Sequence, residues 1–239
     1  MEPCTDEITV EEEKSIEEVP WTIRDILLGI GAFILFMGII FGVLFGLTAL
    51  GIKVDTGLAI FLGEAVLILP VWVIAGKKYQ LTWQKIGLRK FWPGYLFLGV
   101  GLMAVYYLIN LLYSLLILAP LGLSVQGDTM EMLAQLKGSV WLWLGAAVAA
   151  PLAEETFFRG FLFAGLRKSL GWQKAAIISS LLFALMHLEW TAIFPIFMIG
   201  FIFAYLYQRS NSIWPAVILH VGNNLMALCA VSFFIQNMS

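Results

Sequence analysis

Charged side chains are scarce in this sequence. They make up 13% of the 239 residues, whereas an ordinary soluble domain has about 25%. Eight of the sixteen acidic residues lie between Glu2 and Glu18, so the other 221 residues contain only eight more. Hydrophobic residues make up 61%, and the mean hydropathy is +0.90. So few charges could not cover a soluble core of this size, and the chain is predicted to be an integral membrane protein.

Several chemical signatures are also missing. The two cysteines, Cys4 and Cys229, lie in unlike surroundings and form no metal-binding spacing. A net charge of -2 without a basic face argues against nucleic acid as a partner. The sequence contains no HExxH and no Gly-x-Ser-x-Gly motif, and its four aspartates lie in the tail or at span edges. These absences argue against aspartyl, serine and common zinc-helix hydrolases.

Long hydrophobic runs dominate what is present. Seven stretches approach the ~20 residues that cross a bilayer. They lie at about 26–50, 58–75, 94–119, 139–163, 174–188, 191–208 and 212–235. The predicted fold is an all-α polytopic bundle with about seven transmembrane helices, within a range of six to eight. Residues 1–20 are expected to be an acidic, disordered cytoplasmic tail, 21–138 a variable transmembrane region, and 139–235 the functional core.

Lysine and arginine predict the orientation, because cytoplasmic loops are enriched in them. Seven spans with a cytoplasmic N-terminus leave only Lys53 and Lys137 outside and Arg159 within a span. Eleven basic residues then fall inside: Lys14, Arg24, Lys77, Lys78, Lys85, Arg89, Lys90, Arg167, Lys168, Lys174 and Arg209. The expected location is the plasma membrane. A water-filled cavity is expected to open toward this basic, cytoplasmic side.

A few polar residues lie inside the predicted spans, where each ionisable group costs roughly 2.5 to 3.5 kcal/mol. Glu155 and Arg159 are four residues apart and can pair on one helix face, which leaves Glu154 without a partner in its own segment. Any of these groups could simply join helices through hydrogen bonds. Together they could activate water and stabilise an oxyanion, or hold a metal. The polar groups of the spans are Glu64, Glu154, Glu155, Arg159, His187, His220 and Asn224.

Most of these polar residues fall into three motifs on successive hydrophobic spans: Glu154-Glu155-x-x-x-Arg159, Phe183-x-x-x-His187 and His220-x-x-x-Asn224. In this order, the three motifs resemble the CAAX protease and bacteriocin-processing family, which includes the type II CAAX prenyl endopeptidases. The resemblance covers about residues 139–235. It implies an intramembrane endopeptidase.

By this resemblance, Glu154 and His187 would activate the attacking water, and His220 with Asn224 would stabilise the oxyanion. Glu155 and Arg159 would shape the site. The family resemblance leaves two options for a cofactor: zinc held by Glu154, His187 and His220, or no metal at all. The implied partners are the lipid bilayer and a peptide or lipidated-protein substrate. CAAX-like tails, pheromone or bacteriocin peptides and membrane proteins would all suit it.

Two functions of other classes remain open on the sequence alone. A transporter or channel could use Glu64, Glu154 and the histidines as a proton or ion path, although no inverted repeat supports it. A scaffold or bacteriocin-immunity protein could keep the same fold without catalysis. Glu64 by itself favours helix packing or a water-lined cavity over catalysis. The sequence does not indicate an oligomeric state.

Overall fold

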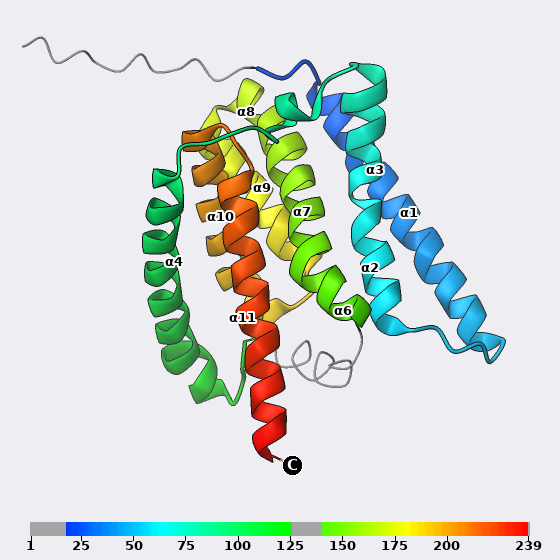
Figure 1. Cartoon of the computed structure of the whole chain (residues 1–239), viewed down its shortest axis with the longest axis vertical. Coiled ribbons are helices and arrows are strands. Elements are labelled where there is room, and N and C mark those ends of the chain that lie inside the picture. The colour runs from blue at the N-terminus through cyan, green and yellow to red at the C-terminus, as the bar shows by residue number, and fades with distance from the viewer. Residues whose placement is uncertain (1–17, 126–139, 239) are drawn as a thin grey trace, which may run out of the picture.

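The computed structural model describes residues 18–125 and 140–238, and the fold within them is a bundle of helices without strands (Figure 1). The all-α membrane class predicted from the sequence is therefore confirmed. Most of the predicted tail, residues 1–17, lies outside the described residues, as does Lys137.

Within the described residues, seven helical passes follow one another, each reversing the direction of the last (Figure 1). Of these described passes, five are long and apolar enough to cross a membrane: Ile23–Ala49, Gly57–Lys78, Gly94–Leu121, Trp190–Ser210 and Trp214–Phe233. The fourth pass, Val140–Leu170, carries more charge, and the fifth, Trp172–Met186, is only 15 residues long. The passes match the seven predicted spans to within a few residues, except that the fourth continues to Leu170.

The helices that make up these passes have the following bounds. The first three passes are α1 (Ile23–Ala49), α2 (Thr56–Val66) with α3 (Ile68–Val71) and η1 (Trp72–Lys78), and α4 (Gly94–Tyr113) with η3 (Ser114–Leu118) and η4 (Ala119–Leu121). The fourth is α6 (Val140–Leu144), η5 (Gly145–Ala149), α7 (Ala150–Glu155), η6 (Thr156–Phe163) and α8 (Ala164–Leu170). The last three are α9 (Trp172–Met186), α10 (Ile193–Ser210) after η7 (Trp190–Ala192), and α11 (Trp214–Met238). A short turn, η2 (Trp83–Ile86), lies between η1 and α4.

The two ends of the bundle differ in charge. The alternating direction of the passes puts the ten described basic residues of the predicted cytoplasmic set at one end, which we call the basic end; it includes Lys77, Lys78, Arg167 and Arg209. The opposite end, which we call the far end, contains Lys53, the end of η4 and the C-terminus of α11 (Figure 1).

The core is densest toward the basic end, where aromatic side chains from distant segments interlock. Trp21, 1% exposed, donates a hydrogen bond from its indole nitrogen to the carbonyl of Phe161 at 2.9 Å, and the two rings lie 5.4 Å apart. Phe163 packs edge-on against Tyr207 from α10. Gly160 and Gly165 let other segments approach the fourth pass, because an added Cβ would lie 2.6 Å from the carbonyl oxygen of Ile86 or 2.5 Å from the Trp21 nitrogen.

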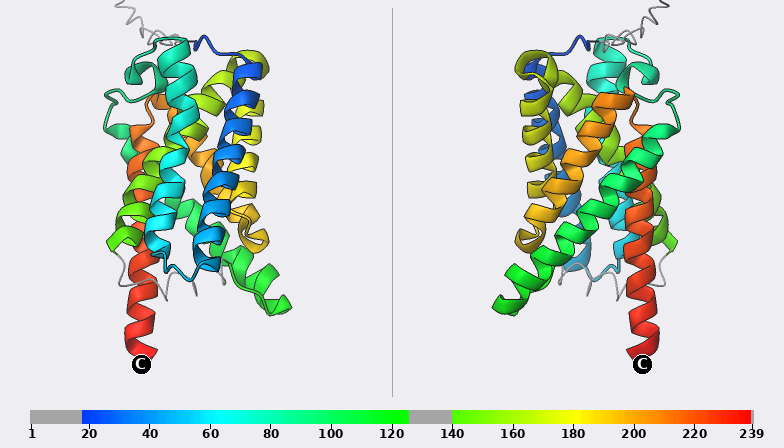
Figure 2. Two further views of the ribbon diagram at one scale, coloured as in Figure 1. Left: turned by 90° about the vertical axis from the view of Figure 1, so that its right-hand side faces the viewer. Right: turned by 90° about the vertical axis from the view of Figure 1, so that its left-hand side faces the viewer.

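Toward the far end the passes separate. Figure 2 shows α4 running at a slant to the other helices, so that its C-terminal part stands away from them. The fifth pass is short and its helix ends at Met186, with His187 as the C-cap, and Leu188, with φ 54°, turns the chain back toward α10. A non-glycine residue in this left-handed region is uncommon.

Candidate active site

The polar residues of the fourth pass lie where its helix changes geometry. Glu154 and Glu155 end α7, and a π-helical segment, η6, begins at the next residue. A second π-helical segment, η5, precedes α7. Such segments often mark functional sites, because the wider turn redirects side chains and leaves backbone groups available. The hydrophobic pattern gave no sign of these π turns.

Glu155 and Arg159 form the ion pair that their spacing predicts. Arg159 Nη1 donates to Glu155 Oε1 at 3.0 Å, and both side chains are fully buried. Arg159 Nη2 donates to the carbonyl of Gly200 in α10 at 3.1 Å, and the guanidinium lies over the ring of Phe183 at 4.5 Å. The pair therefore ties the fourth, fifth and sixth passes together.

His220 lies between the two glutamates. Its Nδ1 is 3.0 Å from Glu155 Oε1, and its Nε2 is 3.5 Å from Glu154 Oε2. A carboxylate only accepts hydrogen bonds, so the Nδ1 proton points at Glu155 and fixes the ring. Glu154 Oε2 is buried and has no hydrogen-bond partner among the described residues. The contact between Glu155 and His220 was not predicted, because nothing in the sequence shows that α11 passes the face shared by Glu155 and Arg159.

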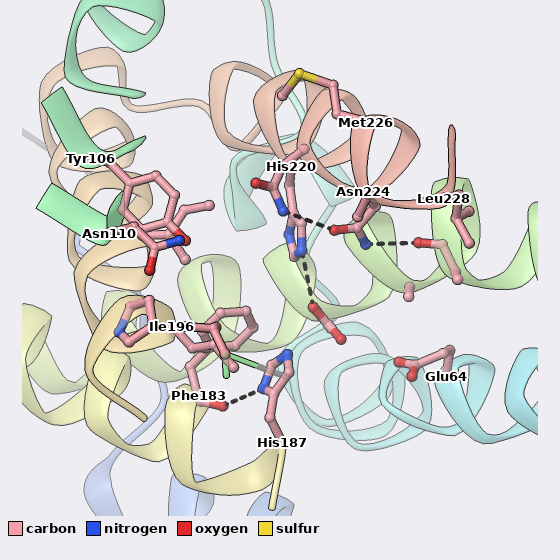
Figure 3. Close-up of a pocket in the computed structure, with 18 of the residues that line it drawn as sticks. Glu64, Tyr106, Asn110, Phe183, His187, Ile196, His220, Asn224, Met226 and Leu228 are labelled. Atoms are coloured by element: carbon pink, nitrogen blue, oxygen red, sulfur yellow. Dashed lines mark hydrogen bonds and ion pairs between the residues drawn. The ribbon is translucent and has the colours of Figure 1, made fainter. Parts of the chain in front are cut away.

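His187 is fixed in a complementary way. Its Nδ1 lies 2.8 Å from the backbone carbonyl of Phe183, one helical turn earlier (Figure 3). Because a carbonyl can only accept, Nδ1 carries the proton, and the lone pair of a neutral ring is then on Nε2. Phe183 also packs edge-on against both histidines, with ring centroids 4.8 Å from His187 and 5.9 Å from His220.

All four predicted catalytic residues line one cavity of about 690 Å³, within the size range of small-ligand sites. Most of its wall is apolar. The polar residues around it are Glu64, Tyr106, Tyr107, Asn110, Glu154, His187, His220, Asn223 and Asn224, several of which are drawn in Figure 3. The structure thus brings together Glu154, His187, His220 and Asn224 from three passes. No hydrogen bond or ion pair joins Glu154 to His187 within the described part of the chain.

Four polar wall residues were not singled out as site residues from the sequence: Tyr106, Tyr107 and Asn110 on α4, and Asn223 on α11. On α4, the sequence signal that could have found them was the three- and four-residue spacing of the two tyrosines from Asn110, which puts these polar groups near one helix face within a hydrophobic span. Asn223 stands next to Asn224, and its adjacency alone could not show that both amides face the cavity.

The expected opening toward the basic end is wrong. On α11 the lining residues run from His220 to Leu228, away from the basic end, and on the fourth pass from Leu142, near the far end, to Glu154. Fully buried side chains fill the layer between His220 and the basic end, including Phe203, Tyr207 and Ile213. The prediction counted residues from the membrane surface and took no account of this aromatic packing.

The zinc option fits poorly. Within residues 18–125 and 140–238, no three His, Cys, Asp or Glu side chains gather so that they could hold a metal ion. His220 already directs one ring nitrogen to Glu155 and the other to Glu154. A zinc site needs three protein ligands around one point, each with a nitrogen or oxygen free for the metal. The side chains named for zinc do not offer this arrangement.

The fold and the site define a class of protein: a helical membrane bundle that encloses a largely apolar cavity with a cluster of polar side chains on its wall. Residues 136–226 match the family model described as type II CAAX prenyl endopeptidase Rce1-like. This confirms the family resemblance predicted from the three motifs.

One curated relative supports the same resemblance. The chain is 30% identical over 79 residues to a Bacillus subtilis (strain 168) protein named "Putative membrane peptidase YdiL". The matched part is 33% of this chain, and it spans only 32% of that protein's length. No solved structure matches the chain.

Proposed function

We propose that this protein is an intramembrane endopeptidase that hydrolyses a peptide bond inside the cavity. The observation that carries the proposal is the meeting of Glu154, His187, His220 and Asn224, from three passes, on the wall of one largely apolar cavity. The family match and the relative's name support the same class. Hydrolysis needs a base, a water molecule and donors for the oxyanion, and these side chains offer each of them except the water.

The reaction begins with water between Glu154 and His187. As its oxygen bonds to the carbonyl carbon, one water proton passes to the Glu154 carboxylate or to His187 Nε2. The carbonyl oxygen becomes an oxyanion beside His220 and the Asn224 amide. When the intermediate collapses, the C–N bond breaks and the leaving amine takes the proton that Glu154 or His187 received. No step in this scheme uses a metal.

Geometry supports this division of roles. Glu155 Oε1 lies 3.0 Å from His220 Nδ1 and holds the ring, while the other ring nitrogen, Nε2, lies 3.5 Å from Glu154 Oε2. Both His220 and Asn224 line the cavity in which the scissile carbonyl would lie.

The proposed substrate is a peptide or lipidated protein that reaches the cavity from within the bilayer. A CAAX-like tail, a pheromone or bacteriocin peptide and a membrane protein all remain candidates. The proposed setting is the plasma membrane, with the N-terminus and the basic end in the cytoplasm, since basic residues favour that side.

The proposal is tested with purified protein in lipid nanodiscs and a panel of lipidated and unlipidated peptides. Glu154→Gln is expected to lower kcat by about 10² to 10⁴, the usual contribution of a general base. Glu64→Gln, a carboxylate of the same cavity, is the matched control and should retain most activity. Metal analysis of the same preparations should find no stoichiometric zinc. If Glu154→Gln cleaves as fast as wild type, a scaffold is the better explanation.

A further inference from the structure

Asn224 is the last member of a chain of hydrogen bonds that begins on another helix. Tyr107 on α4 donates its hydroxyl proton to Asn223 Oδ1 at 2.9 Å. Asn223 Nδ2 donates to Asn224 Oδ1 at 3.2 Å, and Asn224 Nδ2 donates to the carbonyl of Ala146 at 2.8 Å. Three separate passes, α4, α11 and the η5 segment, are joined through these side chains. Figure 3 shows Asn224 donating to this carbonyl.

A single backbone group determines the donor-to-acceptor direction of the whole hydrogen-bond chain. The Ala146 carbonyl can only accept, so the NH₂ group of Asn224 must face it. Asn224 Oδ1 then faces Asn223, whose own NH₂ group must be the donor. The remaining oxygen of Asn223 faces Tyr107, which has a hydroxyl proton to give. No other orientation of the two amides satisfies all three contacts.

The chain leaves one proton of Asn224 uncommitted. An asparagine NH₂ group has two protons, and the Ala146 carbonyl takes only one. Both Asn224 and Asn223 line the cavity, together with His220. If the Asn224 amide rotated by half a turn, it would present an oxygen in place of this donor, and an oxygen repels an oxyanion.

We propose that Tyr107 and Asn223 are positioning residues that hold the Asn224 amide with its N–H toward the reacting carbonyl. This rests on the proposed function, because it gives Asn224 the oxyanion role. It adds that the site depends on α4, which lies outside the segment matched by the family model. Tyr107 is steadied in turn by the ring of Tyr106, whose centroid lies 5.1 Å away.

The test compares Tyr107→Phe with Tyr113→Phe in the full chain. Both tyrosines are on α4, and each hydroxyl makes one hydrogen bond to another segment, but Tyr113 donates to the carbonyl of Thr191 at 3.2 Å and does not line the cavity. Each change is made in wild type and in Asn224→Ala. Thermal unfolding midpoints are measured for all variants, so that the first readout needs no substrate.

The expected thermal result is coupling through the chain. Tyr107→Phe should lower the unfolding midpoint by about 2–4 °C in wild type. In Asn224→Ala it should lower the midpoint by less than half as much, because the hydrogen-bond chain is already broken there. The loss from Tyr113→Phe should be the same in both backgrounds. Equal losses from Tyr107→Phe in the two backgrounds would overturn the proposal.

The second readout is kinetic, on a peptide that wild type cleaves. Tyr107→Phe should lower kcat about tenfold, which corresponds to ~1.4 kcal/mol, and leave KM unchanged, whereas Tyr113→Phe should keep wild-type kcat. A tenfold loss in both variants would mean a merely structural role and would contradict the proposal.

Thermal coupling without a kcat effect would instead remove the oxyanion role of Asn224. If wild type cleaves no peptide, the proposed function fails and the thermal cycle alone decides whether the chain positions Asn224.

Discussion

The two ends of this bundle differ in packing: the same helices are closely packed toward the basic end and surround a cavity toward the far end. Toward the basic end, the fourth pass is buried from Thr156 to Leu166, and every residue of η6 is covered by neighbouring segments. Toward the far end, the same pass forms a cavity wall from Leu142 to Glu154. We call the part toward the basic end the packed half and the part that surrounds the cavity the open half. Glu154, Glu155 and His220 lie at the boundary between them. Such a boundary lets polar groups be held rigidly from one side while they face open space on the other.

The difference between the halves also explains why so much charge is tolerated in the middle of the bundle. Glu155 and Arg159 are on the packed side and satisfy each other, with help from Gly200 and His220. Glu154 and His187 are on the open side and keep unshared lone pairs. The packed half thus supports the geometry, and the open half leaves room for a ligand.

Removing the arginine should disturb the packed half most strongly. Arg159→Ala leaves Glu155 buried without its cation, and breaking one partner of a buried pair costs about 3 to 5 kcal/mol. Unfolding in detergent should therefore show a large loss of stability, and activity should fall with it. Lys168→Ala, whose ion pair with Glu18 is exposed, is the control and should change little. A stable but inactive Arg159→Ala would instead point to direct contact with substrate.

Cysteine labelling should separate the two halves of α11. In a cysteine-free background, with both Cys4→Ala and Cys229→Ala, Ala227→Cys lines the cavity, whereas Ala216→Cys is fully buried toward the basic end. A small water-soluble maleimide should react roughly a hundredfold faster at position 227, because local opening of a packed core costs several kcal/mol. Applying the reagent from one side at a time also tests the orientation. Equal rates at the two positions would contradict the difference between the halves.

A methyl group should be harmful where the backbone of another segment is in close contact, and harmless where it meets nothing. Gly160→Ala would put a Cβ 2.6 Å from the Ile86 carbonyl oxygen, and overpacking of this kind costs about 1–3 kcal/mol. Gly101→Ala on α4 meets nothing within 4 Å and should leave the unfolding midpoint unchanged or slightly higher. The midpoints of both variants are compared with wild type. A loss of equal size in both would mean that backbone propensity, and not the close contact, decides.

The smallest effect is expected at the first turn of the bundle. Trp21→Phe keeps an aromatic ring against Phe161 but removes the hydrogen bond to its carbonyl, which is worth about 0.5–1.5 kcal/mol. The unfolding midpoint should fall slightly, and kcat should stay at the wild-type value. A fall in kcat per folded molecule would show that the packed half does more than support the site.

The sequence predicted the fold class and the membrane passes because apolar run length alone determines them. It also predicted the Glu155–Arg159 pair, since four-residue spacing on one helix is a local property. The contact of His220 with both glutamates could not be predicted, because it depends on how α11 crosses the fourth pass. The direction of the cavity was predicted wrongly for a related reason. Residue counts give depth along a helix but do not show where aromatic side chains from other passes fill the interior.

The roles of Glu154 and His187 are the central claim, and a double-mutant cycle in kcat tests it most directly. Glu154→Gln, His187→Gln and the double variant are compared on one peptide that wild type cleaves. If both groups act on one water molecule, the double variant should be no slower than the slower single variant, because residues that act as a unit lose activity non-additively. Losses that multiply would mean that the two side chains act in separate steps, which would contradict their shared activation of one water molecule.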